Sequence, residues 1–181
     1  MRLLSIFATA TLLAASWVTL FDGKTLTGWV NEGGANFRVE NGVITVDQGP
    51  YTWLRSEKTY KDYELEVEFK TAADGNSGIF LRSAATGRPH ETGYELQIFD
   101  AHKDYPTGGV LGHGKAPANT KFKPNVWNQY QVRHQGKRMI VKLNGKQVLD
   151  LTDDKSTSGY IGLQFNPNKP ISFRNIRIRE L

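Results

Sequence analysis

Residues 93–100 form the part of the chain with the clearest capacity for chemistry. They read Gly-Tyr-Glu-Leu-Gln-Ile-Phe-Asp, and the alternating apolar residues predict a β-strand with one buried face. Glu95 and Gln97 share the opposite face, which puts a carboxylate beside an amide. Asp100 follows the strand, where a β-bulge could turn it onto the same face. The polar face of a strand is often merely solvated. The residues near this strand therefore decide whether its polar face is a plain surface or part of a functional site.

Other polar side chains crowd around this strand in the sequence. Arg82 ends the preceding predicted strand, and the loop that follows contains His102, Tyr105 and His113. A carboxylate beside a histidine can move protons, and an arginine can stabilise a developing negative charge. The alternative for Arg82 is a buried ion pair with Glu95. The alternative for the histidines is a plain position in the loop.

Composition excludes several kinds of function. The 181 residues suffice for one domain with a sizeable core, and the absence of cysteine excludes disulfides, zinc–thiolate sites and cysteine nucleophiles. The net charge of +5 comes without a basic run interleaved with aromatic residues, so nucleic-acid binding is not expected. No G-x-S-x-G, H-E-x-x-H or phosphate-binding glycine motif occurs. No cofactor is implied with certainty, although a carboxylate–histidine cluster could hold a divalent cation such as calcium.

The first 16 residues have the pattern of a secretory signal peptide. Met1-Arg2 gives a basic start, residues 3–15 are apolar or small, and Ala14-Ala15-Ser16 offers small residues for cleavage. The alternative, a buried N-terminal helix, is disfavoured because the stretch has no polar face at helical spacing. The stretch is too short for a convincing transmembrane segment, and no other segment could be one. We therefore expect an exported protein, periplasmic or extracellular, with one domain over residues 17–181.

The rest of the chain reads as short strands joined by turns. Residues 62–70 alternate strictly between apolar and charged residues, which places three glutamates on a face toward solvent or a cleft. Asn41-Gly42 and Asn144-Gly145 are strong two-residue hairpin signals. The apolar phase of residues 171–180 changes midway, which predicts a bulge, and residues 101–123 form a long irregular loop. About a dozen strands predict an all-β fold, a two-sheet antiparallel jelly-roll sandwich.

The spacing of the polar residues in the central strand matches a known catalytic strand in part. Glu95, Gln97 and Asp100 stand at the three positions of the E-x-D-x-x-E strand of laminarinase-type glucanases. A retaining glycosidase needs its two carboxyl groups about 5–5.5 Å apart. The middle residue is an amide and Asp100 is one methylene shorter than glutamate, so the retaining mechanism is not carried over.

A closer resemblance covers nearly all of residues 17–181. Seven short motifs occur in register, and together they are specific. They are Phe21 to Trp29, Asn76 to Arg82, Gly93 to Asp100, Trp127-Asn128, Leu143 to Gly145, Gly162 to Gln164 and Phe173 to Ile176. In these motifs the chain resembles the 3-keto-disaccharide hydrolase family. The resemblance implies a concanavalin A-like jelly roll, an exported bacterial protein, and action on glycosides whose glucose unit is oxidised at C3.

The chemistry that this resemblance implies is simple. A ketone at C3 acidifies the hydrogen at C2, so a general base can remove that proton and the group at C1 can leave by elimination. Water then adds to the product. One base, one acid and one stabiliser of the enolate oxygen suffice.

Residue type and position suggest which residues could act as the base, the acid and the stabiliser of the enolate oxygen. Glu95 or Asp100 could be the base, Arg82 could stabilise the enolate, and a histidine could protonate the leaving oxygen. The candidate catalytic residues are Glu95, Asp100, Arg82 and His113. The candidate substrate-binding residues are Gln97, His102, Tyr105, Gln164 and Asn166.

Two further readings stay open at this point. A carbohydrate-binding module of lectin type would use the same fold without catalysis, and an adhesion domain would show an apolar patch in place of a polar cleft. Convergence of Glu95, Asp100, Arg82 and a histidine in one pocket would favour the enzyme, whereas a lectin would show exposed aromatic platforms and few converging carboxylates. The sequence leaves the glycosidic linkage, the preferred anomer and the oligomeric state open.

Overall fold

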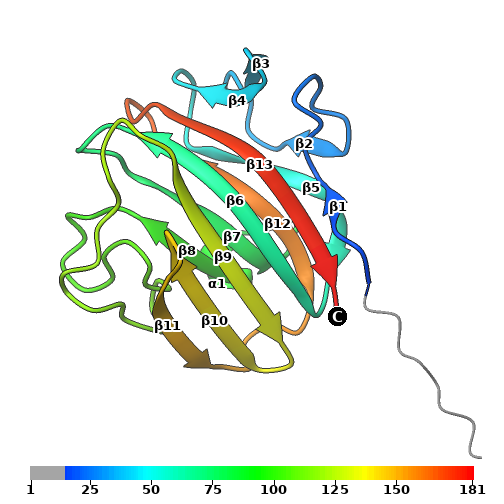
Figure 1. The fold of residues 1–181 in the computed structure, drawn as a ribbon. Helices are drawn as coiled ribbons and strands as arrows, with labels where there is room; N and C mark the ends of the chain where they lie inside the picture. The colour runs from blue at the N-terminus through cyan, green and yellow to red at the C-terminus, as the bar shows by residue number, and fades with distance from the viewer. Residues whose placement is uncertain (1–14) are drawn as a thin grey trace, which may run out of the picture.

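The computed structural model describes residues 15–181, so most of the predicted signal peptide lies outside the described residues. The regular elements of the described chain are all strands apart from one short helical turn (Figure 1). The elements are β1 (Val18–Thr19), β2 (Trp29–Asn31), β3 (Arg38–Glu40), β4 (Val43–Val46), β5 (Thr52–Tyr60), β6 (Tyr63–Thr71), β7 (Ser77–Ser83), α1 (Pro89–Thr92), β8 (Tyr94–Ile98), β9 (Asn128–Gln135), β10 (Arg138–Leu143), β11 (Lys146–Thr152), β12 (Gly159–Phe165) and β13 (Ile171–Glu180).

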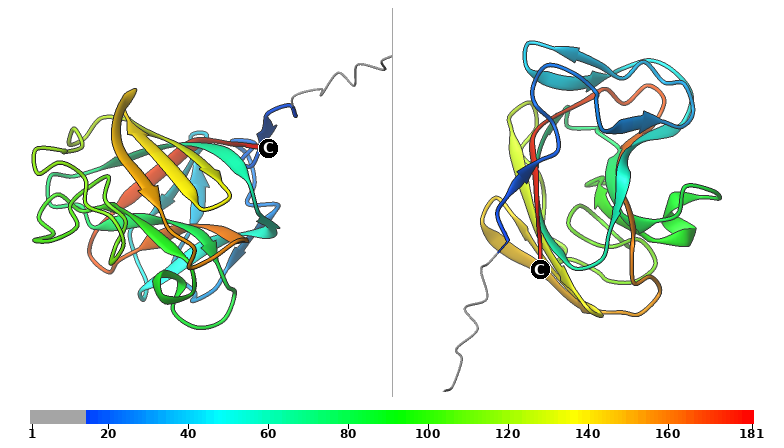
Figure 2. Two further views of the ribbon diagram at one scale, coloured as in Figure 1. Left: turned by 90° about the horizontal axis from the view of Figure 1, so that it is seen from below. Right: turned by 90° about the vertical axis from the view of Figure 1, so that its right-hand side faces the viewer.

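The strands form two antiparallel sheets packed face to face. One sheet has eight strands in the order β11-β10-β9-β6-β13-β4-β3, with β1 added on β13, and the other has five in the order β2-β5-β12-β7-β8. Figure 2 shows the two layers, with α1 on the outer side of the five-stranded sheet. This arrangement confirms the predicted all-β, two-sheet antiparallel sandwich.

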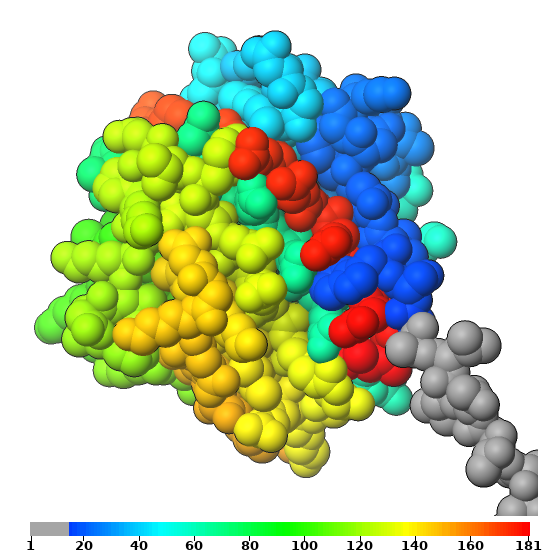
Figure 3. All heavy atoms as spheres, viewed as in Figure 1, coloured from blue at the N-terminus to red at the C-terminus, as the bar shows by residue number. Residues whose placement is uncertain are grey.

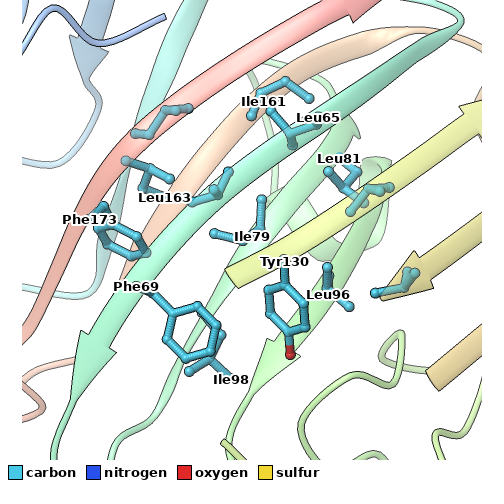
Figure 4. Close-up of a cluster of buried hydrophobic side chains, with 14 of the residues drawn as sticks. Leu65, Phe69, Ile79, Leu81, Leu96, Ile98, Tyr130, Ile161, Leu163 and Phe173 are labelled. Carbon is cyan, nitrogen blue, oxygen red and sulfur yellow. The ribbon is translucent and has the colours of Figure 1, made fainter. Parts of the chain in front are cut away.

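The core lies between the sheets because alternate residues of each strand point inward. In β6 the inward set is Tyr63, Leu65, Val67 and Phe69, each at most 1% exposed. Figure 4 shows residues of this layer meeting side chains from β7, β8 and β12. The strict alternation of residues 62–70 is thereby confirmed as one buried face.

Turn residues account for the tight connections. Asn41 and Gly42 both have positive φ, as do Asn144 and Gly145, which is the backbone of the favoured two-residue hairpin. The last strand carries the predicted irregularity, because its register with β6 shifts between Arg174 and Arg177. These local signals therefore place two hairpin turns and one bulge of the eight-stranded sheet.

Figure 3 shows the molecule from the side of the eight-stranded sheet, whose outer face carries ion pairs between β6 and β13. Glu64, Glu66 and Glu68 of β6 pair with Arg179, Arg177 and Arg174 of β13, respectively. These glutamates lie on the opposite side of the molecule from the strand face that holds Glu95. Among residues 15–181 no helix is long and apolar enough to cross a membrane.

Candidate active site

Glu95 and Gln97 of β8 point away from the core, onto the outer face of the five-stranded sheet. The other three residues of the strand are wholly buried in the core. Glu95 and Gln97 are also buried, at 4% and 3% exposure, although they face outward. Their burial comes from neighbouring segments that rise around them, so this strand face is not a simple solvated surface.

Those segments enclose a cleft of about 550 Å³. Its floor is the outer face of β8 and β12. Its rim comes from α1, from the segments that precede β5 and β7, and from the segments that follow β8 and β12. The lining residues are Tyr51, Asn76, Arg88, His90, Glu95, Gln97, Phe99, His102, Leu111, Gln164 and Asn166. The cleft has the size and mixed lining of a small-molecule site. It thus brings together Glu95, Gln97, His102, Gln164 and Asn166, which the sequence had suggested.

A row of amides holds one oxygen of Glu95. Gln164 Nε2 donates to Glu95 Oε1 at 2.8 Å, and Asn166 Nδ2 donates to Gln164 Oε1 at 2.9 Å. Asn166 Nδ2 also lies 3.1 Å from Asn76 Oδ1. The Gln164 amide can donate to the carboxyl whether or not Glu95 carries a proton. The row therefore fixes the orientation of Glu95 without fixing its charge.

The second oxygen of Glu95 faces a histidine. His90 Nδ1 lies 3.9 Å from Glu95 Oε2, which is beyond hydrogen-bond distance. The same Nδ1 is buried without a hydrogen-bond partner in the described structure. Two proton-carrying groups that line the same cleft therefore stand next to each other without a hydrogen bond between them.

The surroundings push both groups toward their neutral forms. Burial raises the pKa of Glu95 to about 7, against a smaller lowering by the Gln164 hydrogen bond. Burial also lowers the pKa of His90. The Glu91 carboxylate opposes this lowering, and the smaller effects of the positive charges on Arg88 and Lys155 add to it. At neutral pH the pair therefore contains a substantial fraction of protonated Glu95 facing an unprotonated imidazole.

A glycine beneath Glu95 makes room for its side chain. Gly78 of β7 pairs with Gln97 of β8. A Cβ atom on Gly78 would lie 2.9 Å from Glu95 Cγ and 3.0 Å from its Oε1. Only glycine at this position lets the carboxyl lie flat against the sheet.

Arg82 does not reach the cleft, contrary to the sequence-based hypothesis. Between the pairs Tyr160–Ser83 and Gly162–Phe80, β7 has one residue more than β12, and Arg82 at this bulge has φ +52°. The bulge turns its side chain off the face that carries Glu95. Its guanidinium is buried at 1% exposure.

The buried guanidinium of Arg82 instead joins turns that lie far apart in the sequence. It donates to the carbonyl oxygens of Lys61, Gly136, Ser156 and His134 and pairs with Asp62 at 3.0 Å. The alternative, a buried ion pair with Glu95, is also wrong, because the carboxylate that pairs with Arg82 is that of Asp62. Arg82 is therefore a structural residue.

Three other candidates also lie outside the cleft lining. No bulge follows β8, and Asp100 Oδ1 accepts a long 3.4 Å hydrogen bond from the Phe122 amide. His113 faces Asp153, with Nδ1 and Oδ2 2.9 Å apart. Tyr105 packs edge-on against His102, with ring centroids 5.9 Å apart, and thus supports a residue of the cleft. The site therefore has one carboxylate, Glu95, in place of the expected pair.

The sequence reasoning missed His90, Arg88 and Tyr51. Pro89 begins a single helical turn that folds back over β8 and brings His90 into the cleft lining. Gly93 permits that close return, since a Cβ there would lie 2.6 Å from the carbonyl oxygens of Leu81 and Arg82. The signal was present as a proline and a glycine flanking one histidine.

Calcium was the cation considered from the sequence. Among residues 15–181 no group of three or more histidines and carboxylates lies close enough to hold a metal ion. The lining of the cleft offers amides, one carboxylate and two imidazoles. That donor set does not resemble the oxygen-rich shell that calcium prefers.

Comparison with known proteins gives a consistent result. A protein of Bacteroides thetaiotaomicron named 3-keto-disaccharide hydrolase is 34% identical over 79 residues, which cover 37% of this chain and only 27% of that protein. A crystal structure from Parabacteroides distasonis, provisionally described as a glycosyl hydrolase, superposes with a TM-score of 0.80 at 24% identity over 91% of this chain and 94% of that one.

The β-glucanase of Bacillus licheniformis has the same fold, with a TM-score of 0.64 at 15% identity over 94% of this chain and all of that one. This likeness confirms the predicted jelly-roll sandwich. A model of 3-keto-alpha-glucoside-1,2-lyase-like domains matches residues 16–179. The chain therefore belongs to the family of 3-keto-alpha-glucoside-1,2-lyase-like domains.

Proposed function

We propose that this protein cleaves the glycosidic bond of 3-keto-glycosides, by elimination across C1 and C2 followed by addition of water. The family, the relative named 3-keto-disaccharide hydrolase and the polar cleft support a glycosidase-like role. The observation that carries the proposal is the pair formed by Glu95 and His90, a buried acid facing an unpartnered imidazole nitrogen at 3.9 Å.

The environments of the two groups suggest their roles. A carboxyl whose pKa is raised to about 7 is still protonated in large part at neutral pH and can donate to a leaving oxygen. An imidazole whose pKa is lowered stays unprotonated and can accept a proton. We therefore assign Glu95 as the acid and His90 as the base, which reverses the role that the sequence first suggested for Glu95.

The step balances with these two groups. The His90 imidazole takes the proton from C2, a double bond forms between C1 and C2, and the bond from C1 to the leaving oxygen breaks with its electron pair. Glu95 gives its proton to that oxygen. When water adds at C1, the Glu95 carboxylate takes a proton from the water. The imidazolium, whose N–H exchanges with solvent while the intermediate is bound, gives a proton to C2. Arg88 and Gln97 line the cleft and can donate to the C3 oxygen while it carries negative charge.

Sugar release from two substrates tests this assignment. One substrate is a 3-keto-disaccharide such as 3-keto-trehalose, and the other is the 3-keto form of 4-nitrophenyl glucoside, whose phenolate leaves without protonation. Loss of a general acid or base costs about 10²- to 10⁴-fold. Glu95→Gln should lose that factor on the disaccharide and much less on the aryl glycoside, whereas His90→Gln should lose it on both.

The alternatives give different results. Equal losses of Glu95→Gln on both substrates would contradict its role as the acid. A folded wild-type protein that releases nothing but binds the unoxidised sugar in a titration would be a carbohydrate-binding module. Export to the periplasm or the medium is a separate proposal, and N-terminal sequencing of the mature protein tests it, with a start near Trp17 as the expected result.

A further inference from the structure

A hydrogen-bonded chain outside the cleft ends on the turn that carries His90. Lys155 Nζ donates to the carbonyl oxygen of His90 at 2.8 Å and lies 3.2 Å from His113 Nε2. On the far side of the ring, His113 Nδ1 lies 2.9 Å from Asp153 Oδ2. Tyr94 Oη donates to the other oxygen of Asp153 at 2.8 Å.

Only one arrangement of protons satisfies this chain. The lysine ammonium has no acceptor, so His113 Nε2 must accept, and the proton of the neutral ring then sits on Nδ1 and points to Asp153. Asp153 receives three donors, since the Lys155 amide also donates to its Oδ1 at 2.8 Å. Each of the side chains of Lys155, His113, Asp153 and Tyr94 has a hydrogen-bond partner within this set. The position of the Lys155 side chain is therefore well defined, although the residue is exposed.

This set of hydrogen-bonded side chains contacts the segments that carry both Glu95 and His90. Tyr94 immediately precedes Glu95, and the Leu111 amide of the same loop as His113 donates to the Glu95 carbonyl at 3.0 Å. On the other side, α1 is a single turn without a side-chain hydrogen bond at its N-cap. A turn this short has little stability of its own and needs contacts from elsewhere.

We propose that Lys155 is a positioning residue that holds the α1 turn, and thereby His90, at its working distance from Glu95. The inference rests on the proposed function. A displacement of about 1 Å can cost about 100-fold in rate, so a loosened turn should lower kcat while leaving the binding residues of the cleft in place.

The test compares Lys155→Met, Lys155→Arg and Lys137→Met. Lys137 is a matched control because it is exposed and pairs with Asp154 in the same loop. We expect Lys155→Met to lower kcat about 10- to 100-fold with KM changed less than threefold. Lys155→Arg should recover most of the rate, and Lys137→Met should behave as wild type.

Hydrogen exchange provides a readout that does not depend on activity. The amides of Glu91, Thr92 and Gly93 donate within the α1 turn, and they should exchange faster in Lys155→Met only. Unchanged exchange, or faster exchange with wild-type kcat, would overturn the proposal. If wild type cleaves no 3-keto-glycoside, the proposed function fails, and exchange alone decides whether Lys155 holds the turn.

Discussion

Replacing Glu95 with glutamine should stabilise the protein at alkaline pH while it removes activity. The raised pKa means that the native state holds a proton on Glu95 at pH values where the unfolded chain has lost it. The wild-type protein must therefore lose stability as pH rises from about 4.5 to about 7. Glutamine has the shape of the protonated acid and can still accept from Gln164, so the variant should avoid this loss.

The size of the effect follows from the shift. The pKa rises from 4.5 to about 7, and each unit corresponds to about 1.4 kcal/mol. Linkage then gives a cost of about 1 kcal/mol at pH 5 and about 3 kcal/mol at pH 8. The difference in unfolding free energy between Glu95→Gln and wild type should grow by about 2 kcal/mol between these two values.

Urea denaturation at pH 5 and pH 8 measures this difference directly. The pH comparison cancels any constant effect of the substitution on packing, because that effect is the same at both values. A free-energy difference that is independent of pH would refute the reasoning, since it would mean that Glu95 titrates alike in the native and unfolded states.

Three further predictions follow from the same structure. Gly78→Ala should push Glu95 from its place and lower kcat about 10- to 100-fold; wild-type kcat in a folded variant would contradict this. Arg82→Met should lower the free energy of unfolding measured in urea by about 3 kcal/mol or more and leave the kcat of the folded protein unchanged. Loss of kcat without loss of stability would instead support a catalytic role for Arg82. Burial lowers the pKa of His134 to about 3, so this residue should cost stability as pH falls below about 6.5. A His134→Gln variant should therefore lose less stability than wild type between pH 7 and pH 4, and equal losses would argue against a buried neutral ring.

Much of the fold was predictable because it depends on local rules. Alternation in residues 62–70 identified a buried strand face, and Asn-Gly pairs identified two hairpin turns. The same alternation placed Glu95 and Gln97 together on one face of β8. In an extended backbone alternate side chains point to opposite faces of the strand, and this alternation does not depend on what the strand packs against.

The site was only partly predictable because single residues interrupt that period. One extra residue in β7 turned Arg82 away from Glu95, and nothing in the local sequence marks the bulge. Asp100 would have needed a bulge that β8 does not have. His90 enters the cleft through a helical turn that returns over the sheet, which is a matter of tertiary contact and not of spacing.

Hydrogen exchange at C2 of the substrate tests the central claim most directly. A 3-keto-disaccharide is incubated in D₂O with each protein. Deuterium at C2 of the oxidised unit is then measured in the released 3-keto sugar and in the unreacted substrate, and an incubation without protein serves as the blank. We expect wild type to release a 3-keto sugar that carries deuterium at C2. Glu95→Gln should exchange the C2 hydrogen of the substrate without cleaving it, and His90→Gln should show neither exchange nor cleavage. Cleavage by wild type that leaves C2 unlabelled above the blank, or wild-type exchange by His90→Gln, would contradict it.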